Sequence, residues 1–143
     1  MTRRSLLAFL GLLLAKPLSV LAAWNEQAFG AKTAADALKT IGAASPAPSN
    51  DIAIEAPQIA ENGAVVPIEI TSNVRGTRSI MVLVDKNPFP LVGKFDFTEG
   101  ALPFVKLNVK MGETSDVRII AEAGGKSYTA SKNIKITIGG CGG

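Results

Sequence analysis

The sequence predicts an all-β fold: an immunoglobulin-like antiparallel β-sandwich with a short N-terminal helix and a flexible C-terminal tail. Three observations support this prediction. Apolar and polar residues alternate in several segments after residue 51, turn-forming residues separate these segments at intervals of about ten residues, and no helical pattern lies between them. The chain has 143 residues, 47% hydrophobic and 19% charged, which is typical of one globular domain.

Residues 1–23 are predicted to be an export signal. Arg3 and Arg4 precede a short apolar run that is interrupted at Lys16, and small residues close the segment. This order is typical of a secretory signal peptide, and the run is too short for the roughly 20 residues of a membrane-spanning helix. The paired arginines followed by an apolar pair also resemble the twin-arginine export signal, with a Sec signal as the alternative. We therefore expect a periplasmic protein with no membrane anchor after cleavage.

The basic character of the chain comes from this leader. The formal charge is +3 and the pI about 9.2. The leader contains three of the 15 basic residues and none of the 12 acidic ones, so the mature chain would have 12 of each. No basic cluster that could follow a phosphate backbone is left, which argues against nucleic-acid binding.

Residues 24–50 are predicted to form a helix followed by a linker. The segment 24–44 is rich in alanine and has an incomplete helical stripe of larger apolar residues. Asn25 is placed to cap the helix and Gly42 to end it. The prolines and small polar residues of 45–50 are typical of a linker.

Residues 51–138 are predicted to form the sandwich. Strands are expected around Ile52–Ala56, Val66–Ile70, Ser79–Val84, Phe95–Phe97, Val105–Met111, Val117–Ala123, Ser127–Ser131 and Ile134–Ile138. The run Ser79–Val84 is continuously apolar, as expected of a central strand. Gly124 and Gly125 stand between alternating segments, which predicts a two-residue hairpin turn. They do not complete a phosphate-binding loop, because Ile120 occupies the place of the first glycine.

The composition limits the chemistry that the chain can perform. It has no histidine, which excludes the commonest general base and metal ligand, and one cysteine alone does not form a usual zinc site. Carboxylates such as Asp85 and Asp116 lie near predicted turns, where solvated surface charge is their expected role. We therefore expect no catalytic residue, no metal and no cofactor.

The last five residues, 139–143, read GGCGG and contain the only cysteine, Cys141. No histidine or cation stands beside it in the sequence to lower its pKa, so any activation would have to come from another protein. Glycine has no side chain and accepts φ of either sign, so the segment would be narrow and supple, and five extended residues reach about 17 Å. Cys141 is therefore free, bonded to another molecule or carrying a group, and it stands on a narrow arm formed by Gly139, Gly140, Gly142 and Gly143 that could enter a slim channel in a partner enzyme.

The leader, the predicted sandwich and the terminal GGCGG together resemble the SoxY family, the carrier subunits of the bacterial thiosulfate-oxidising (Sox) system. Two further segments resemble the family: Lys86–Leu91, which contains an NP-x-P sequence, and the stretch from Gly125 through Lys135 to the tail. The tail is the specific part of this resemblance, since sandwich folds serve many functions.

The resemblance implies a carrier that is not itself an enzyme. In such proteins a c-type cytochrome complex attaches thiosulfate oxidatively to the tail cysteine as an S-thiosulfonate. A hydrolase then releases sulfate and leaves a persulfide, which a molybdenum- and haem-dependent sulfane dehydrogenase oxidises in organisms that have one. A second sandwich protein, SoxZ, is the partner in a heterodimer. Cys141 would be the attachment site.

Two other hypotheses fit parts of the sequence. The terminal Gly142 and Gly143 are similar to the end of ubiquitin-like sulfur carriers, in which the last glycine becomes a thiocarboxylate; those are cytosolic β-grasp proteins that need ATP. Alternatively, the chain is a periplasmic interaction module that forms an intermolecular disulfide through Cys141.

Overall fold

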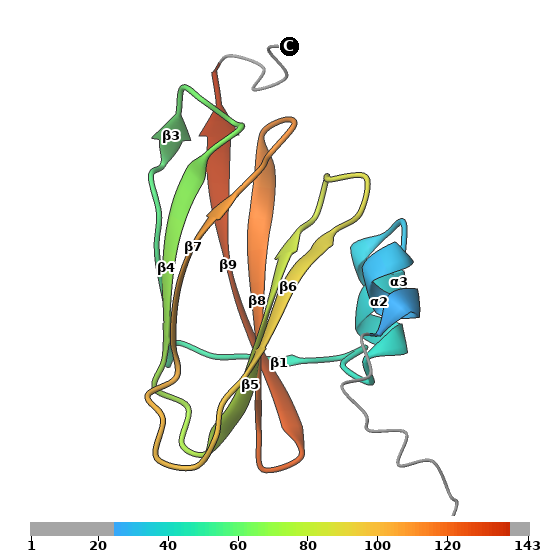
Figure 1. The fold of residues 1–143 in the computed structure, drawn as a ribbon, viewed down its shortest axis with the longest axis vertical. Helices are drawn as coiled ribbons and strands as arrows, with labels where there is room; N and C mark the ends of the chain where they lie inside the picture. The colour runs from blue at the N-terminus through green and yellow to red at the C-terminus, as the bar shows by residue number, and fades with distance from the viewer. Residues whose placement is uncertain (1–24, 138–143) are drawn as a thin grey trace, which may run out of the picture.

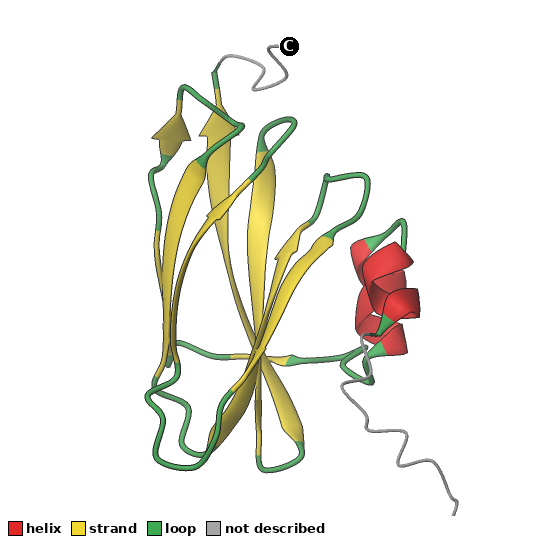
Figure 2. Cartoon of the chain, viewed as in Figure 1, coloured by secondary structure: helices red, strands yellow, loops and turns green. Residues whose placement is uncertain are grey.

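In the computed structural model, residues 25–137 are described; they form two β-sheets packed face to face, with two short helices against one of them (Figures 1 and 2). The larger sheet has the strand order β1-β9-β8-β5-β6, with β3 also paired to β9, and the smaller sheet has the order β2-β4-β7. The strands are β1 (Ala47–Pro48), β2 (Ile52–Glu55), β3 (Ile59–Ala60), β4 (Val66–Ser72), β5 (Thr77–Val84), β6 (Leu91–Asp96), β7 (Phe104–Val109), β8 (Ser115–Ala123) and β9 (Lys126–Ile136). The predicted immunoglobulin-like sandwich is confirmed.

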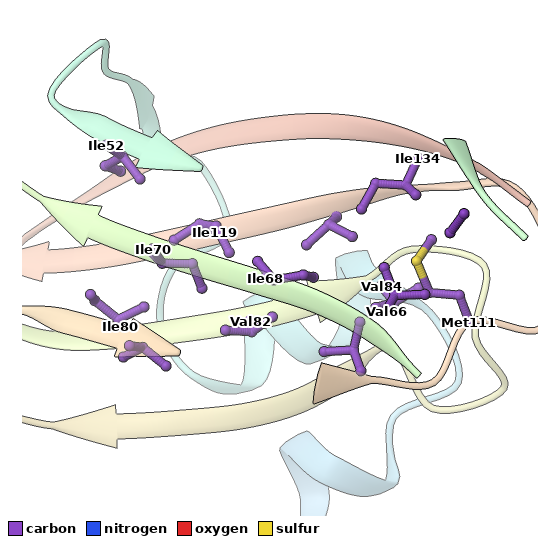
Figure 3. Packing of buried hydrophobic residues seen from close by; sticks show 14 of the residues in the cluster. Ile52, Val66, Ile68, Ile70, Ile80, Val82, Val84, Met111, Ile119 and Ile134 are labelled. Atoms are coloured by element: carbon purple, nitrogen blue, oxygen red, sulfur yellow. The ribbon is translucent and has the colours of Figure 1, made fainter. Parts of the chain in front are cut away.

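The core lies between the two sheets and follows the alternation in the sequence. Along β4, Val66, Ile68 and Ile70 are fully buried, whereas the residues between them are half-buried or exposed. Figure 3 shows these side chains pointing into one interior together with those from β5 and β8, such as Val82 and Ile119. Burying one such side chain contributes about 1.5–3 kcal/mol, so this inner face holds the two sheets together.

Strand β5 is buried on both faces, as its continuous apolar run predicted. Ile80 and Val82 face the core between the sheets. Met81 and Leu83 face outward and are completely covered by a second apolar cluster that the helices supply. The helices therefore cover the outer face of the larger sheet at β5 and β6, as Figure 1 shows.

The single helix expected within residues 24–44 is divided into α2 (Glu26–Gly30) and α3 (Ala34–Thr40). The backbone is extended at Ala31 and again at Thr33. Thr33 is the N-cap of α3, since its Oγ1 accepts a hydrogen bond of 3.1 Å from the N–H of Asp36. The predicted cap at Asn25 is confirmed, since its side chain accepts from the N–H of Ala28 at 3.1 Å. Thr33 competes with helix continuation because it offers the backbone a capping bond.

The two strands expected at Ser127–Ser131 and Ile134–Ile138 form one long strand, β9, which ends at Ile136; Ile138 lies outside the described residues. Lys132 interrupts the apolar alternation between them, but its backbone pairs with Val117 of β8, and its ammonium donates a 2.8 Å hydrogen bond to the carbonyl of Ala56. The predicted two-residue hairpin is confirmed: Gly124 and Gly125 have φ of 58° and 75° and join β8 to β9. Positive φ at both turn residues is what this tight turn requires.

Two strands of two residues each, β1 and β3, were not predicted. Both pair in parallel with β9, at Ala47–Tyr128 for β1 and at Ile59–Lys135 for β3. The segment expected to be a linker thus contains a sheet edge. Within residues 25–137, no helix is long and apolar enough to cross a membrane.

Candidate functional site

The residues predicted to form the carrier site lie outside the described part of the chain. These are Cys141 and the four glycines Gly139, Gly140, Gly142 and Gly143. What the structure describes is the strand that leads to them, up to Thr137, and the end of the sandwich at which this strand finishes. The candidate site is therefore built from the base of the tail and the loops around it.

The base of the tail is hydrogen-bonded on both sides. On the side of β3, the N–H of Lys135 donates to the carbonyl of Gln58 at 3.0 Å, and the N–H of Thr137 donates to the carbonyl of Ala60 at 3.2 Å. On the side of β8, the N–H of Ile136 donates to the Oγ1 of Thr114 at 2.9 Å. The sheet thus holds the backbone as far as Thr137, four residues before Cys141.

Three loops lie at the same end of the sandwich as the end of β9: residues 61–65, 85–90 and 110–114. Figure 1 shows them toward the end marked C, and we call them the tail-side loops. They share this end because β5 and β7 finish there, and β4 and β8 begin there, in antiparallel ladders.

The tail-side loops are bonded to one another. Asn87 donates from Nδ2 to the carbonyl of Lys110 at 2.7 Å and accepts from the N–H of Gly112 at 3.5 Å. The N–H of Met111 donates to the carbonyl of Gly63 at 2.7 Å, so the third loop is joined as well. These bonds link segments that are far apart in the sequence, which makes the end of the sandwich one connected surface.

An ion pair fixes the start of the loop 85–90 to β8. The Nη2 of Arg118 donates to Oδ2 of Asp85 at 2.6 Å, and its Nε donates to Oδ1 at 3.2 Å. The hydrogen bonds to Asp85 raise the pKa of Arg118 above its ordinary value, against the opposing effect of partial burial. The carboxylate expected to be a free surface charge is thus a structural partner of Arg118, and a bidentate pair of this kind is directional.

The described residues offer little chemistry of their own. Among residues 25–137 no group of three or more His, Cys, Asp or Glu side chains is arranged to hold a metal ion. The Lys86–Glu113 pair, 3.7 Å apart, has side chains 61% and 64% exposed, and exposed pairs of this kind stabilise a fold little. This surface is suited to supporting and presenting the tail.

The sequence predicts the tail but not the residues that support its base. Thr114, Asn87 and Arg118 act through partners 22 to 33 residues away. The NP-x-P sequence at Asn87–Pro90 lies in one of the tail-side loops. Its two prolines beside an asparagine were a signal for a rigid loop, because proline fixes φ and asparagine bonds readily to nearby backbone.

The comparisons with known proteins agree with one another. Residues 37–141 match the family model of the sulfur oxidation protein SoxY. The solved structure of the sulfur carrier protein SoxY from Chlorobium limicola f thiosulfatophilum is 35% identical and superimposes with a TM-score of 0.68, covering 80% of this chain and 100% of that one. A superoxide reductase (neelaredoxin) from Ignicoccus hospitalis shares the fold alone, with 20% identity, a TM-score of 0.52, and coverage of 59% and 78%. No curated protein matches the sequence significantly.

Proposed function

The chain belongs to the SoxY family of sulfur oxidation proteins, and on this basis we propose that it is a periplasmic carrier that holds thiosulfate-derived sulfur covalently on Cys141. The structural observation that supports this proposal most directly is the set of hydrogen bonds by which the backbone of β9 is held to its neighbours as far as Thr137. It gives the tail a fixed base four residues before the only cysteine, at one end of the sandwich.

The first step is an oxidative conjugation. The Cys141 thiolate and the outer sulfur of thiosulfate form an S–S bond, which gives Cys–S–S–SO₃⁻ and releases two electrons. A c-type cytochrome complex accepts these electrons at its haems. The chain supplies only the thiol, which agrees with the absence of histidine from its sequence.

The second step is hydrolysis by a partner enzyme. Water cleaves the S–SO₃⁻ bond, sulfate leaves, and a persulfide, Cys–S–SH, stays on the carrier. A sulfane dehydrogenase would act on this outer sulfur where the organism has one. A SoxZ-like sandwich subunit is the proposed partner in a heterodimer, and the twin-arginine-like leader is the proposed export signal.

The intact mass of the protein from cells grown with and without thiosulfate tests this proposal. We expect the thiosulfate-grown protein to have added masses of one thiosulfate or one sulfur, and Cys141→Ser to have none. A bare thiol under both conditions would contradict the carrier function. A dimer linked through Cys141 as the only modified form would instead favour the disulfide module.

A further inference from the structure

The length of the tail limits where a partner enzyme can lie. Thr137 is bonded to Ala60, and Cys141 follows four residues later. Four fully extended residues span about 14 Å, and folding of the segment could only shorten this reach. An enzyme that acts on sulfur attached to Cys141 must therefore lie against the tail-side loops.

Two large apolar side chains on these loops are exposed, Val65 at 54% and Phe89 at 48%. Phe89 is the aromatic one, and aromatic side chains are the more frequent anchors of protein interfaces. Its loop is held in one conformation: the carbonyl of Pro90 accepts from the N–H of Val84 at 2.8 Å, and the N–H of Lys86 donates to Oγ of Ser115 at 3.0 Å. A rigid exposed aromatic side chain loses little entropy on binding, and such residues dominate the energetics of protein interfaces.

Lys32 adds a positive charge to this aromatic side chain. It lies between α2 and α3, is exposed, and places its Nζ 3.8 Å from the centre of the Phe89 ring. This distance is within the range of a cation–π interaction. The helical segment thus reaches the same end of the sandwich as the tail, and it presents a cation beside the ring.

We propose that Phe89 and Lys32 form a docking contact for the c-type cytochrome complex that attaches thiosulfate to Cys141. The aromatic ring enters an apolar pocket on the enzyme, and the Lys32 ammonium faces a carboxylate at the rim of that pocket. This inference depends on the proposed carrier function and deepens it, since it assigns the surface by which the carrier is recognised. The tail enters the enzyme while the body of the carrier holds the complex together.

The test uses the full mature chain with its SoxZ-like partner subunit, the c-type cytochrome conjugating complex, thiosulfate and an oxidised electron acceptor. Adduct formation is followed by intact mass at carrier concentrations below KM. Phe89→Ala should lower kcat/KM about tenfold. Lys32→Glu should lower it about threefold or more, because it places like charges face to face.

Phe104→Ala is the matched control, since Phe104 is also 48% exposed but begins β7 at the opposite end of the sandwich. Its kcat/KM should stay within twofold of that of the unaltered chain. Alkylation of Cys141 by iodoacetamide requires no docking and should proceed at the same rate in all variants.

The outcomes separate the two proposals. Equal rates for the unaltered chain, Phe89→Ala and Lys32→Glu would overturn the docking contact alone, as would an equal loss in Phe104→Ala. If the unaltered chain gains no adduct, the carrier function is overturned and the docking contact with it.

Discussion

The two ends of the sandwich are closed in different ways. At the end where β9 finishes, the loops bond to one another across 22 to 29 residues of sequence, through Asn87, Thr114 and the N–H of Lys86. At the opposite end the loop side chains bond locally, as where Thr77 Oγ1 donates to the carbonyl of Val74 at 2.6 Å. Distant segments there are joined through backbone bonds instead: the N–H of Ser72 donates to the carbonyl of Pro103 at 3.0 Å, and the N–H of Asn73 donates to the carbonyl of Asp51 at 2.7 Å. A hollow lined by residues such as Gly76 and Ala101 lies between the β4–β5 loop and the β6–β7 loop at this end.

The difference is therefore in the groups that make the bonds. The tail-side loops form a platform whose cross-links use individual side chains, so single substitutions can remove them. Bonds between distant loops add no connection that the sandwich requires, but they fix the position of the surface from which the tail starts. In the proposed carrier, this would fix the position of Thr137, from which the tail starts, relative to the docking contact.

The largest expected effect concerns the core beneath this platform. Met111 is fully buried in the same cluster as Val66 and Val84, whereas Leu102, near the opposite end, is 83% exposed. Met111→Ala should lower the free energy of unfolding by about 2–5 kcal/mol, and Leu102→Ala should change it by less than about 0.5 kcal/mol. Urea denaturation measures both, and equal values for the two variants would contradict the assigned core.

A smaller effect should separate the two ends by function. Asn87→Ala removes the bonds to Lys110 and Gly112, and Thr77→Val removes those to Val74 and Ser72. Each should cost about 1 kcal/mol of folding stability. Only Asn87→Ala should also slow transfer of thiosulfate to the carrier, measured as above at a temperature where both variants are folded. Equal transfer rates for the two variants would show that transfer of thiosulfate to the carrier does not depend on the hydrogen bonds between the tail-side loops.

The smallest expected effect is local, at the base of the tail. Thr114→Val keeps the shape of the side chain but removes the acceptor for the N–H of Ile136. Losing this hydrogen bond should lower the free energy of local opening at Ile136 by about 1 kcal/mol. Hydrogen exchange of this amide should then be about fivefold faster, whereas exchange of the Val82 amide in central β5 should stay unchanged. Unchanged exchange at Ile136 would mean that pairing with β3 alone holds the strand.

Much of the sandwich could be predicted because apolar and polar residues alternate along its strands in step with buried and exposed positions. Val66, Ile68 and Ile70 face the core as their spacing indicated, and the apolar run of β5 is covered on both faces. Strands β1 and β3 could not be predicted, since two residues show no alternation and both depend on pairing with β9. The helix boundary at Thr33 depends on a capping bond that competes with good helix propensity on both sides.

The candidate site divides in the same way. Cys141 and its glycines could be proposed from the sequence because their chemistry is local, and they stay a prediction because they lie outside the described residues. The platform could not, because the bonds of Asn87 and the contact between Lys32 and Phe89 join residues that only the fold brings together. Residue type alone does not reveal such partners.

The most direct test of the carrier function follows individual sulfur atoms. Thiosulfate labelled in its outer sulfur is supplied with the conjugating complex and the sulfate-releasing hydrolase, and trypsin then releases the peptide Ile136–Gly143, since Lys135 precedes it. We predict that the label first appears on Cys141 as a thiosulfonate and stays there as a persulfide after sulfate has left. Label on the terminal carboxylate of Gly143, or none on this peptide, would contradict the account.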